Sequence, residues 1–366
     1  MIGDSVGALG WDKLKGRRPG LGLIALCLVV ACSESFLPAW AVIDLRAVAA
    51  LVEVEGKPGR ARPNPGDDVQ VSILVVDQGA PASDEQGVPA LTPDLLQWAF
   101  AACVPLPTLI GPPICGDVIQ PCDGCTGTPP DDRLAFPVVR FQVPSAAELQ
   151  AAGADRVLVQ GVICADGPPA ADAIIQFILG ETDDLNPCED PNDEGRFVSV
   201  TIPIEPTPDD PNLHPEISNL FLDGRSWPPP YDQSVPRTAP REGCKADLDG
   251  LSDAEREKHP SAGSEASSIE LSVTEDSLQA YIVDEMTRTE EMQVSWLTDG
   301  GEFERTFSFI TDLPATVLTF WRPLVDVPED GLLVRFNFVI RDGRGGTDWV
   351  ERGLCVLPAP ADESPP

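Results

Sequence analysis

Short segments in which apolar and polar residues alternate recur along most of the chain. In VRFNFVIR (334–341), apolar side chains at every second position alternate with Arg335 and Asn337. The same period of two occurs in VQVSILVV (69–76) and in FVSVTIPI (197–204). This period is typical of a strand that buries one face. The pattern therefore predicts a protein built mainly from β-strands.

Comparable stretches predict further strands, whereas signals for helices are few. The expected strands lie at 42–54, 95–103, 134–143, 156–164, 216–224, 268–273, 292–298, 303–310 and 347–356. The clearest helix signal is SAAELQAAG, in which Ser145 and Glu148 form a capping box and Gly153 is a natural stop. A second capping box, Ser252 with Glu255, predicts one more short helix. The segment 171–180 fits a helix or a strand equally well.

These elements favour antiparallel β-sandwiches. The chain has 39 prolines and 31 glycines, which indicate many turns, and no long helices alternate with the strands. A mature chain of about 330 residues exceeds the size that one hydrophobic core serves, so two domains are expected. We predict sandwich domains at 42–206 and 212–358, with long loops and short helices, and a disordered tail at 359–366.

The second predicted domain carries a resemblance to a known class of domain. VSWLTDGGEF and VRFNFVIRDGRGGTDW resemble the middle and last strands of bacterial immunoglobulin-like and PKD-like domains. Trp98 and Trp296 each fall in an early central strand, which fits a sandwich core. More loosely, the chain is similar to two-domain lipoproteins of Gram-negative bacteria. The resemblance implies two immunoglobulin-like sandwiches at the cell surface and brings no catalytic residues. Cys103 and Cys164 lack the spacing around a tryptophan that antibody domains show.

The N-terminus predicts export. A basic cluster at 13–18 precedes an apolar run at 21–31, about half of the ~20 residues that a transmembrane helix needs. The order Val-Val-Ala-Cys at 29–32 resembles the bacterial lipobox. We therefore expect a lipoprotein signal peptide at 1–31, acylation of Cys32, and a tether at 32–41 that holds the protein on a membrane.

Residues near this site refine the expected location. Ser33 directly follows Cys32 and resembles the pattern of lipoproteins that pass to the outer membrane, on its periplasmic or surface face. The alternative is an ordinary signal peptide cut after Ala39 or Ala41, which would leave a soluble secreted protein.

The remaining cysteines agree with export. Eight are left in the mature chain: Cys103, Cys115, Cys122, Cys125, Cys164, Cys188, Cys244 and Cys355. An even number in an exported protein predicts disulfides. We favour Cys164–Cys188 and Cys244–Cys355. The other four allow three pairings, and a local Cys122–Cys125 bond occurs in one of them. A redox pair or zinc site in PCDGCTG is the less favoured alternative.

Charge and motifs exclude several functions. The formal net charge is −34, so nucleic acid would be repelled, and no glycine loop typical of nucleotide binding is present. The two histidines, His214 and His259, each precede a proline, and we interpret them as surface turn residues and not as catalytic bases. No catalytic residue is predicted, and no cofactor is expected.

Calcium is the one cofactor with a candidate site. KADLDGLSD places Asp247, Asp249 and Asp253 around Gly250, a fragment of an EF-hand-type loop without the glutamate at its twelfth position. Solvated acidic loops explain the same residues, and we favour that interpretation.

The sequence thus predicts a non-enzymatic, membrane-anchored protein that presents sandwich domains to a protein or glycan ligand, or serves envelope structure. The long segments 105–130 and 223–267 are the expected partner surfaces. Within the latter, SWPPPY (226–231) is interpreted as a stiff stretch with Trp227 packed on a sandwich. A secreted hydrolase using carboxylates or a metal, and a calcium-stabilised scaffold, are the alternatives.

Overall fold

The computed structural model describes most of the chain after residue 38. The described residues are 39–76, 96–106, 113–127, 137–165, 167–170, 187–205, 211–227, 259–283, 285–329 and 331–359. They belong to one compact unit, which begins at Ala39. The predicted signal peptide, Cys32 and most of the predicted tether lie outside the described residues. No helix among the described residues is long and apolar enough to cross a bilayer.

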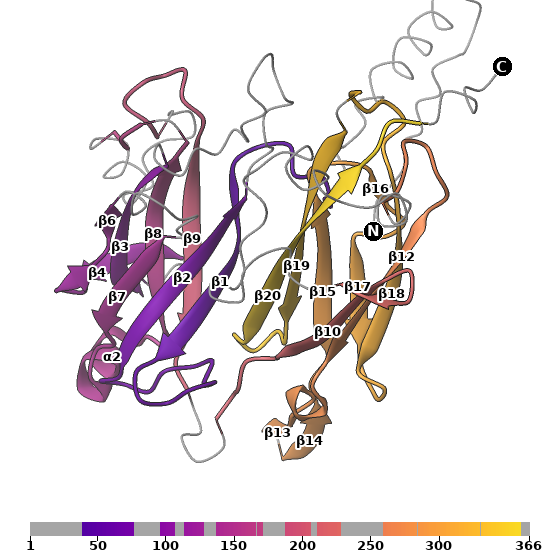
Figure 1. The fold of residues 1–366 in the computed structure, drawn as a ribbon. Coiled ribbons are helices and arrows are strands. Elements are labelled where there is room, and N and C mark those ends of the chain that lie inside the picture. Colours follow the sequence, from indigo (N-terminus) through magenta and orange to yellow (C-terminus); the bar gives the residue numbers. More distant parts are fainter. Residues whose placement is uncertain are drawn as a thin grey trace, which may run out of the picture. The chain divides into compact units, whose positions relative to one another are not determined.

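Two antiparallel sheets form a first sandwich (Figure 1). One sheet has the order β1 (Arg46–Val54), β2 (Asp68–Val76), β7 (Val138–Gln142) and β5 (Cys122–Asp123). The other has the order β4 (Ile114–Val118), β3 (Gln97–Leu106), β8 (Arg156–Cys164) and β9 (Gly195–Pro203), and β6 (Thr126–Gly127) also pairs with β3. Alternate residues of both sheets, among them Ile73, Trp98 and Val159, fill one core.

The second sandwich is built in the same way. One sheet has the order β11 (Arg225–Ser226), β10 (Ile217–Leu222), β12 (Ser267–Val273), β18 (Thr316–Arg322) and β16 (Glu302–Phe303). The other has the order β17 (Phe307–Ile310), β15 (Met292–Thr298), β19 (Leu332–Arg341) and β20 (Thr347–Val356). A 3-10 turn, η1 (Glu275–Ser277), and a hairpin of β13 (Ala280–Val283) and β14 (Met286–Thr289) follow β12.

The core of the second sandwich is aromatic. Trp296 and Phe338 meet edge to face with ring centroids 5.3 Å apart, and Trp321 and Phe336 do so at 5.0 Å. Trp227 also packs edge to face on Phe336 at 5.3 Å, as predicted. Edge-to-face contacts place the positive ring edge on the negative face and add to the free energy of burial.

Strand order gives both sandwiches an immunoglobulin-like topology. In such domains the first strand pairs with the second, and the second also pairs with the strand that precedes the last two. The third strand pairs with the last strand but one, which also pairs with the last strand. The orders β1-β2-β7 and β3-β8-β9 satisfy this rule, and so do β10-β12-β18 and β15-β19-β20. The predicted fold class, antiparallel immunoglobulin-like sandwiches, is therefore confirmed. The predicted domain limits stay predictions.

The predicted helix is present between β7 and β8. It is α2 (Ala146–Ala152), and the capping box is formed because the Ser145 backbone N–H donates to Glu148 Oε2 at 2.8 Å. Gly153 ends the helix in the left-handed conformation.

Several expectations about segments were wrong. No strand was expected within the long segment 105–130, but its described part forms β4, β5 and β6. The expected strand at 303–310 is divided between β16 and β17, which lie in different sheets. The expected strand at 42–54 begins only at Arg46. Ahead of it, Ala41 forms a β-bridge with Thr298 of the second sandwich, and the N–H of Val42 donates to the carbonyl of Thr298. Strand β18 and the β13–β14 hairpin were not expected.

Disulfides tie neighbouring strands of the first sandwich. Cys103 on β3 is bonded to Cys115 on β4, and Cys122 to Cys125. Cys164, at the end of β8, is bonded to Cys188, which is the pairing favoured from the sequence. The bridge between the two sheets that antibody domains contain is thus replaced by bonds to adjacent segments. Cys355 is also disulfide-bonded, and Cys244 lies outside the described residues.

Candidate functional site: the junction of the two sandwiches

An apolar cluster joins the outer face of β1 and β2 to the outer face of β15, β19 and β20. Its buried members are Val42, Leu74, Val76, Leu297, Val339 and Trp349. Because side chains alternate along a strand, Val339 points away from the core that Phe338 and Ile340 fill. The outer face of this sheet is therefore apolar where the first sandwich covers it, and the junction is buried.

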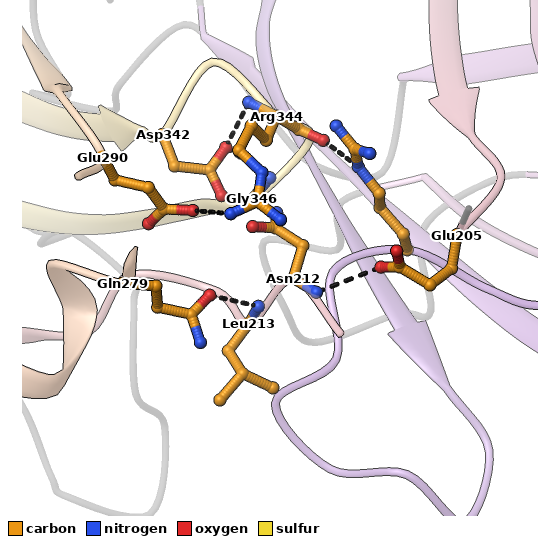
Figure 2. Close-up of polar contacts among 9 residues, drawn as sticks. Glu205, Asn212, Leu213, Gln279, Glu290, Asp342, Arg344 and Gly346 are labelled. Carbon is orange, nitrogen blue, oxygen red and sulfur yellow. Dashed lines mark hydrogen bonds and ion pairs between the residues drawn. The ribbon is translucent and has the colours of Figure 1, made fainter. Parts of the chain in front are cut away.

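Beside this cluster, the turn between β19 and β20 is organised by Asp342. Its Oδ1 accepts hydrogen bonds from the backbone N–H of Arg344 at 2.7 Å and of Gly346 at 2.8 Å. Its Oδ2 accepts from Nδ2 of Asn212 at 2.7 Å. Figure 2 shows the bond between Asp342 and the backbone of Arg344. Asp342 is buried, and these three donors replace the hydrogen bonds that water would give to its side-chain oxygens.

Arg344, from the same turn, reaches a buried carboxylate and a ring. Its Nη1 lies 2.7 Å from Oε1 of Glu290, which is 1% exposed. Its guanidinium stands 4.2 Å from the centroid of the Tyr281 ring. Burial, together with the nearby Asp342 carboxylate, raises the pKa of Glu290 to about 7, and Arg344 opposes this shift. Oε2 of Glu290 has no hydrogen-bond partner.

The segments before β2 and before β10 complete the cluster. Nε of Arg62 donates to the carbonyl of Arg344, which ties the first sandwich to the turn. The backbone N–H of Asn212 donates to Oε2 of Glu205 at 3.0 Å, and that of Leu213 donates to Oε1 of Gln279 at 2.9 Å. Figure 2 shows these contacts arranged around Asn212. We call this set, with Asp342, Arg344 and Glu290, the junction cluster.

His214 lies at the same junction and is not a surface turn residue, so that prediction was wrong. Its Nε2 lies 2.6 Å from the carbonyl of Val52 on β1, and its Nδ1 accepts from the N–H of Thr347 on β20 at 3.0 Å. Nε2 must therefore carry the proton. Burial lowers the pKa of His214, which keeps the ring neutral. Both ring nitrogens are used, and neither can act as a base.

Most residues singled out from the sequence do not belong to this cluster. Asp247, Asp249 and Asp253, the calcium candidates, lie outside the described residues, as do Cys32 and Cys244. Within the described residues, no group of three His, Cys, Asp or Glu side chains is placed to hold a metal ion. The DGRGG turn was recognised in the sequence, but its partners were not.

Contacts within the protein hold the ionisable side chains of this site. Asp342 is held by three donors, Glu290 by Arg344, and His214 by two backbone groups. A general acid or base needs a free position toward a substrate. Among these groups, Oε2 of Glu290 is the oxygen without a hydrogen-bond partner. The bond from Arg62 to the carbonyl of Arg344 connects the first sandwich to the turn.

Comparisons with known proteins add little to this picture. No family model matches the chain. No curated protein matches it either. Among solved structures, the two tandem V-type regions of a v-region-containing chitin binding protein are 10% identical, with 85% of this chain and 100% of that chain covered and a TM-score of 0.24. A marsupial T cell receptor is 10% identical, with 87% and 75% covered and a TM-score of 0.18. The fold assignment accordingly rests on the strand order.

Proposed function

We propose that the protein is an exported bacterial lipoprotein, held on the outer membrane by acylated Cys32, that displays its two sandwiches without catalysing a reaction. The displayed surfaces bind a protein or glycan ligand, or serve the structure of the envelope. The observation that carries this proposal is the junction cluster, in which Glu290 pairs with Arg344 in the second sandwich and Arg62 of the first sandwich donates to the carbonyl of Arg344.

The junction supports display because it makes a rigid scaffold from two modules. Buried apolar side chains and charge-assisted hydrogen bonds fix the sheets, so loops at the ends can vary at little cost to the core. An enzyme of this kind would need convergent acids that reach a substrate. Here Glu290 and Asp342 are 1% and 5% exposed.

Disulfides support the export step. Cys103–Cys115, Cys122–Cys125 and Cys164–Cys188 are bonded, and such bonds persist in oxidising compartments outside the cytosol. The lipobox-like residues before Cys32 agree with export, because they provide a signal for cleavage and a site for acylation at Cys32.

Metabolic labelling with an alkyne-bearing fatty acid tests the anchor. The full chain should incorporate the label, should fractionate with the outer membrane, and should accumulate uncut in the presence of globomycin. Cys32→Ala should abolish the label, whereas Cys27→Ala, the matched control, should retain it. Label that survives Cys32→Ala, or a soluble protein free in the medium, would contradict the lipoprotein and favour plain secretion.

A carboxylate hydrolase is the second candidate, favoured by the pKa of about 7 of Glu290 beside Asp342. If it were correct, the purified chain would cleave an envelope polysaccharide or peptide, and Glu290→Gln would lose that activity while remaining folded. The display proposal predicts no cleavage by either protein. For a calcium-stabilised scaffold, the melting temperature would fall on addition of chelator, and we expect it to stay unchanged.

A further inference from the structure

A groove runs between the two strands that end the sheets of the first sandwich. β1 is the last strand of one sheet and β9 the last of the other (Figure 1), so each has one strand neighbour in the described part of the chain. The space between them measures about 480 Å³ and is lined by 46–50 of β1 and 196–201 of β9. Arg341, Gly345 and Thr347 of the second sandwich also line it. We call it the β1–β9 groove.

Arginines line this groove in a chain whose formal net charge is −34. Arg196 pairs with Asp44 and Glu194 at 2.9 Å each. Arg341 instead donates to Oγ of Ser295 at 3.0 Å and to the carbonyl of Val48. Arg46 donates to the carbonyl of Ala41, and its Nε has no hydrogen-bond partner.

The hydrogen bonds that Arg46 and Arg341 make with the described residues therefore go to neutral acceptors. Burial lowers the pKa of Arg46, and the nearby Asp44 opposes this shift. Burial lowers the pKa of Arg341, and no acidic neighbour opposes the shift. A guanidinium held by neutral acceptors can still gain from a carboxylate, because charge-assisted bonds are about twice as strong as neutral ones. Among the described residues the groove thus offers the charge of Arg341, which has no acidic neighbour, and the Nε of Arg46, which has no hydrogen-bond partner.

The rest of the groove suits an extended backbone. Ala47, Ala50 and Val200 are partly buried at the margin of the first core and line the groove with small apolar side chains. On β1, the carbonyls of Val48 and Val52 are already held by Arg341 and His214. Among the described residues, the side of β9 away from β8 has no strand neighbour, and it is the better edge for an added strand.

We propose that the β1–β9 groove binds an extended acidic peptide segment of a partner protein, which adds to β9 as a strand and places a carboxylate beside Arg46 and Arg341. This inference rests on the proposed display function and names the partner that the display serves. Backbone hydrogen bonds to β9 supply affinity, and the alternating apolar and acidic side chains supply specificity. Charges on the acidic surface that lie more than a Debye length of about 8 Å away are screened. The charges that line the groove therefore determine the electrostatic attraction of the peptide.

A fluorescein-labelled peptide of alternating valine and glutamate tests this proposal against the same peptide with lysine in place of glutamate. At physiological ionic strength the glutamate peptide should raise fluorescence anisotropy with saturation, and the lysine peptide should not. Hydrogen exchange should slow in β9 when the glutamate peptide is bound. Binding should weaken as salt is added.

Thr201 and Thr287 provide matched variants, because both are exposed strand residues and only Thr201 is on β9. Thr201→Glu should weaken binding about fivefold and Thr201→Lys should strengthen it, whereas Thr287→Glu should leave it unchanged. Each variant should keep the melting temperature of the parent, which separates binding from folding.

Three outcomes would overturn the proposal: equal binding of the two peptides, equal effects of the two Thr→Glu variants, or protection outside β9. Self-association of the chain in sedimentation, lost in Thr201→Glu, would assign the groove to a second copy instead. The display function would survive these outcomes, since its own test is acylation of Cys32 and the absence of cleavage.

Discussion

Glu290 shows how burial in this protein changes the pKa of a single side chain. Its carboxyl is buried beside Asp342, which raises its pKa, whereas Arg344 and a backbone hydrogen bond at Gln279 stabilise the anion. Asp299 is a second case, because burial raises its pKa to about 6 and Arg335 opposes the shift. Both groups bind protons more tightly in the folded chain than in the unfolded one. Their contribution to stability is therefore complete below their ordinary pKa values and is lost as pH rises through 6 to 7.

Glu290→Gln should remove part of this pH dependence. Glutamine resembles the protonated carboxyl, so the variant should be more stable relative to the parent at pH 8 than at pH 4.5. Melting temperatures measured from pH 4 to pH 8 check this. Glu291→Gln, an exposed neighbour, is the control and should follow the parent. Parallel curves for Glu290→Gln and the parent would show that Glu290 titrates normally.

Asp342→Ala should destabilise the protein by about 3 kcal/mol, because it leaves three donors of the junction cluster without their acceptor. Urea unfolding gives the free energy directly. Asp326→Ala, at an exposed aspartate, should change the stability by less than about 0.5 kcal/mol. A similar loss in both variants would mean that the turn is held by its backbone alone.

At the scale of elements, the alternation of apolar and polar residues predicted many of the strands that contribute to a core. Strands without a clear alternation were missed. In β19 apolar and polar residues alternate from Val334 to Phe338, and α2 has both of its caps in the sequence. β18 was missed because Leu318 and Phe320 on its outer side are exposed, at 46% and 41%, and hide the alternation. The β13–β14 hairpin has no buried side chain, so no apolar pattern marks it.

The contacts of the junction cluster could not be predicted from the sequence for a related reason. The DGRGG turn is visible in the sequence, but Asn212 lies 130 residues from Asp342, and Glu290 lies 54 residues from Arg344. Nothing local in either segment indicates its partner. Contacts of this kind depend on how the sheets pack, and a single sequence does not record that packing.

Gly161→Ala tests the close approach of β8 to β3. A Cβ at this position would lie 2.0 Å from the carbonyl oxygen of Ala99 and 2.6 Å from Cα of Phe100, both backbone atoms that cannot move aside. We expect a loss of about 3 kcal/mol in urea unfolding, or insoluble protein. Gly153→Ala has open space and a left-handed backbone, so it should cost about 1 kcal/mol. Equal effects would contradict the close packing.

At the scale of the whole molecule, the apolar cluster at the junction makes the two sandwiches depend on each other. Leu74 and Val76 of the first sandwich lose their cover if Leu297, Val339 and Trp349 move away. Exposing such side chains costs about 1.5–3 kcal/mol each. The two sandwiches are therefore expected to unfold as one cooperative unit.

Leu74→Asp should break this dependence. Leu74 is 1% exposed and faces the junction, so a carboxylate there would be buried against apolar side chains. Scanning calorimetry should show one transition for the parent and two for the variant, with the first at lower temperature. Leu74→Ala should lower the single transition without dividing it. Two transitions in the parent would contradict a coupled junction.

The pairing of Val42 and Trp40 with Thr298 has a consequence for force. The N–H of Val42 donates to the carbonyl of Thr298 at 2.8 Å, and the N–H of Thr298 donates to the carbonyl of Trp40 at 3.0 Å. A pull on the chain ahead of Trp40 would load β15 of the second sandwich before it loads β1 of the first. Force applied to the chain from a cell surface would then act on both sandwiches, and neither sandwich would be pulled away from the other on its own.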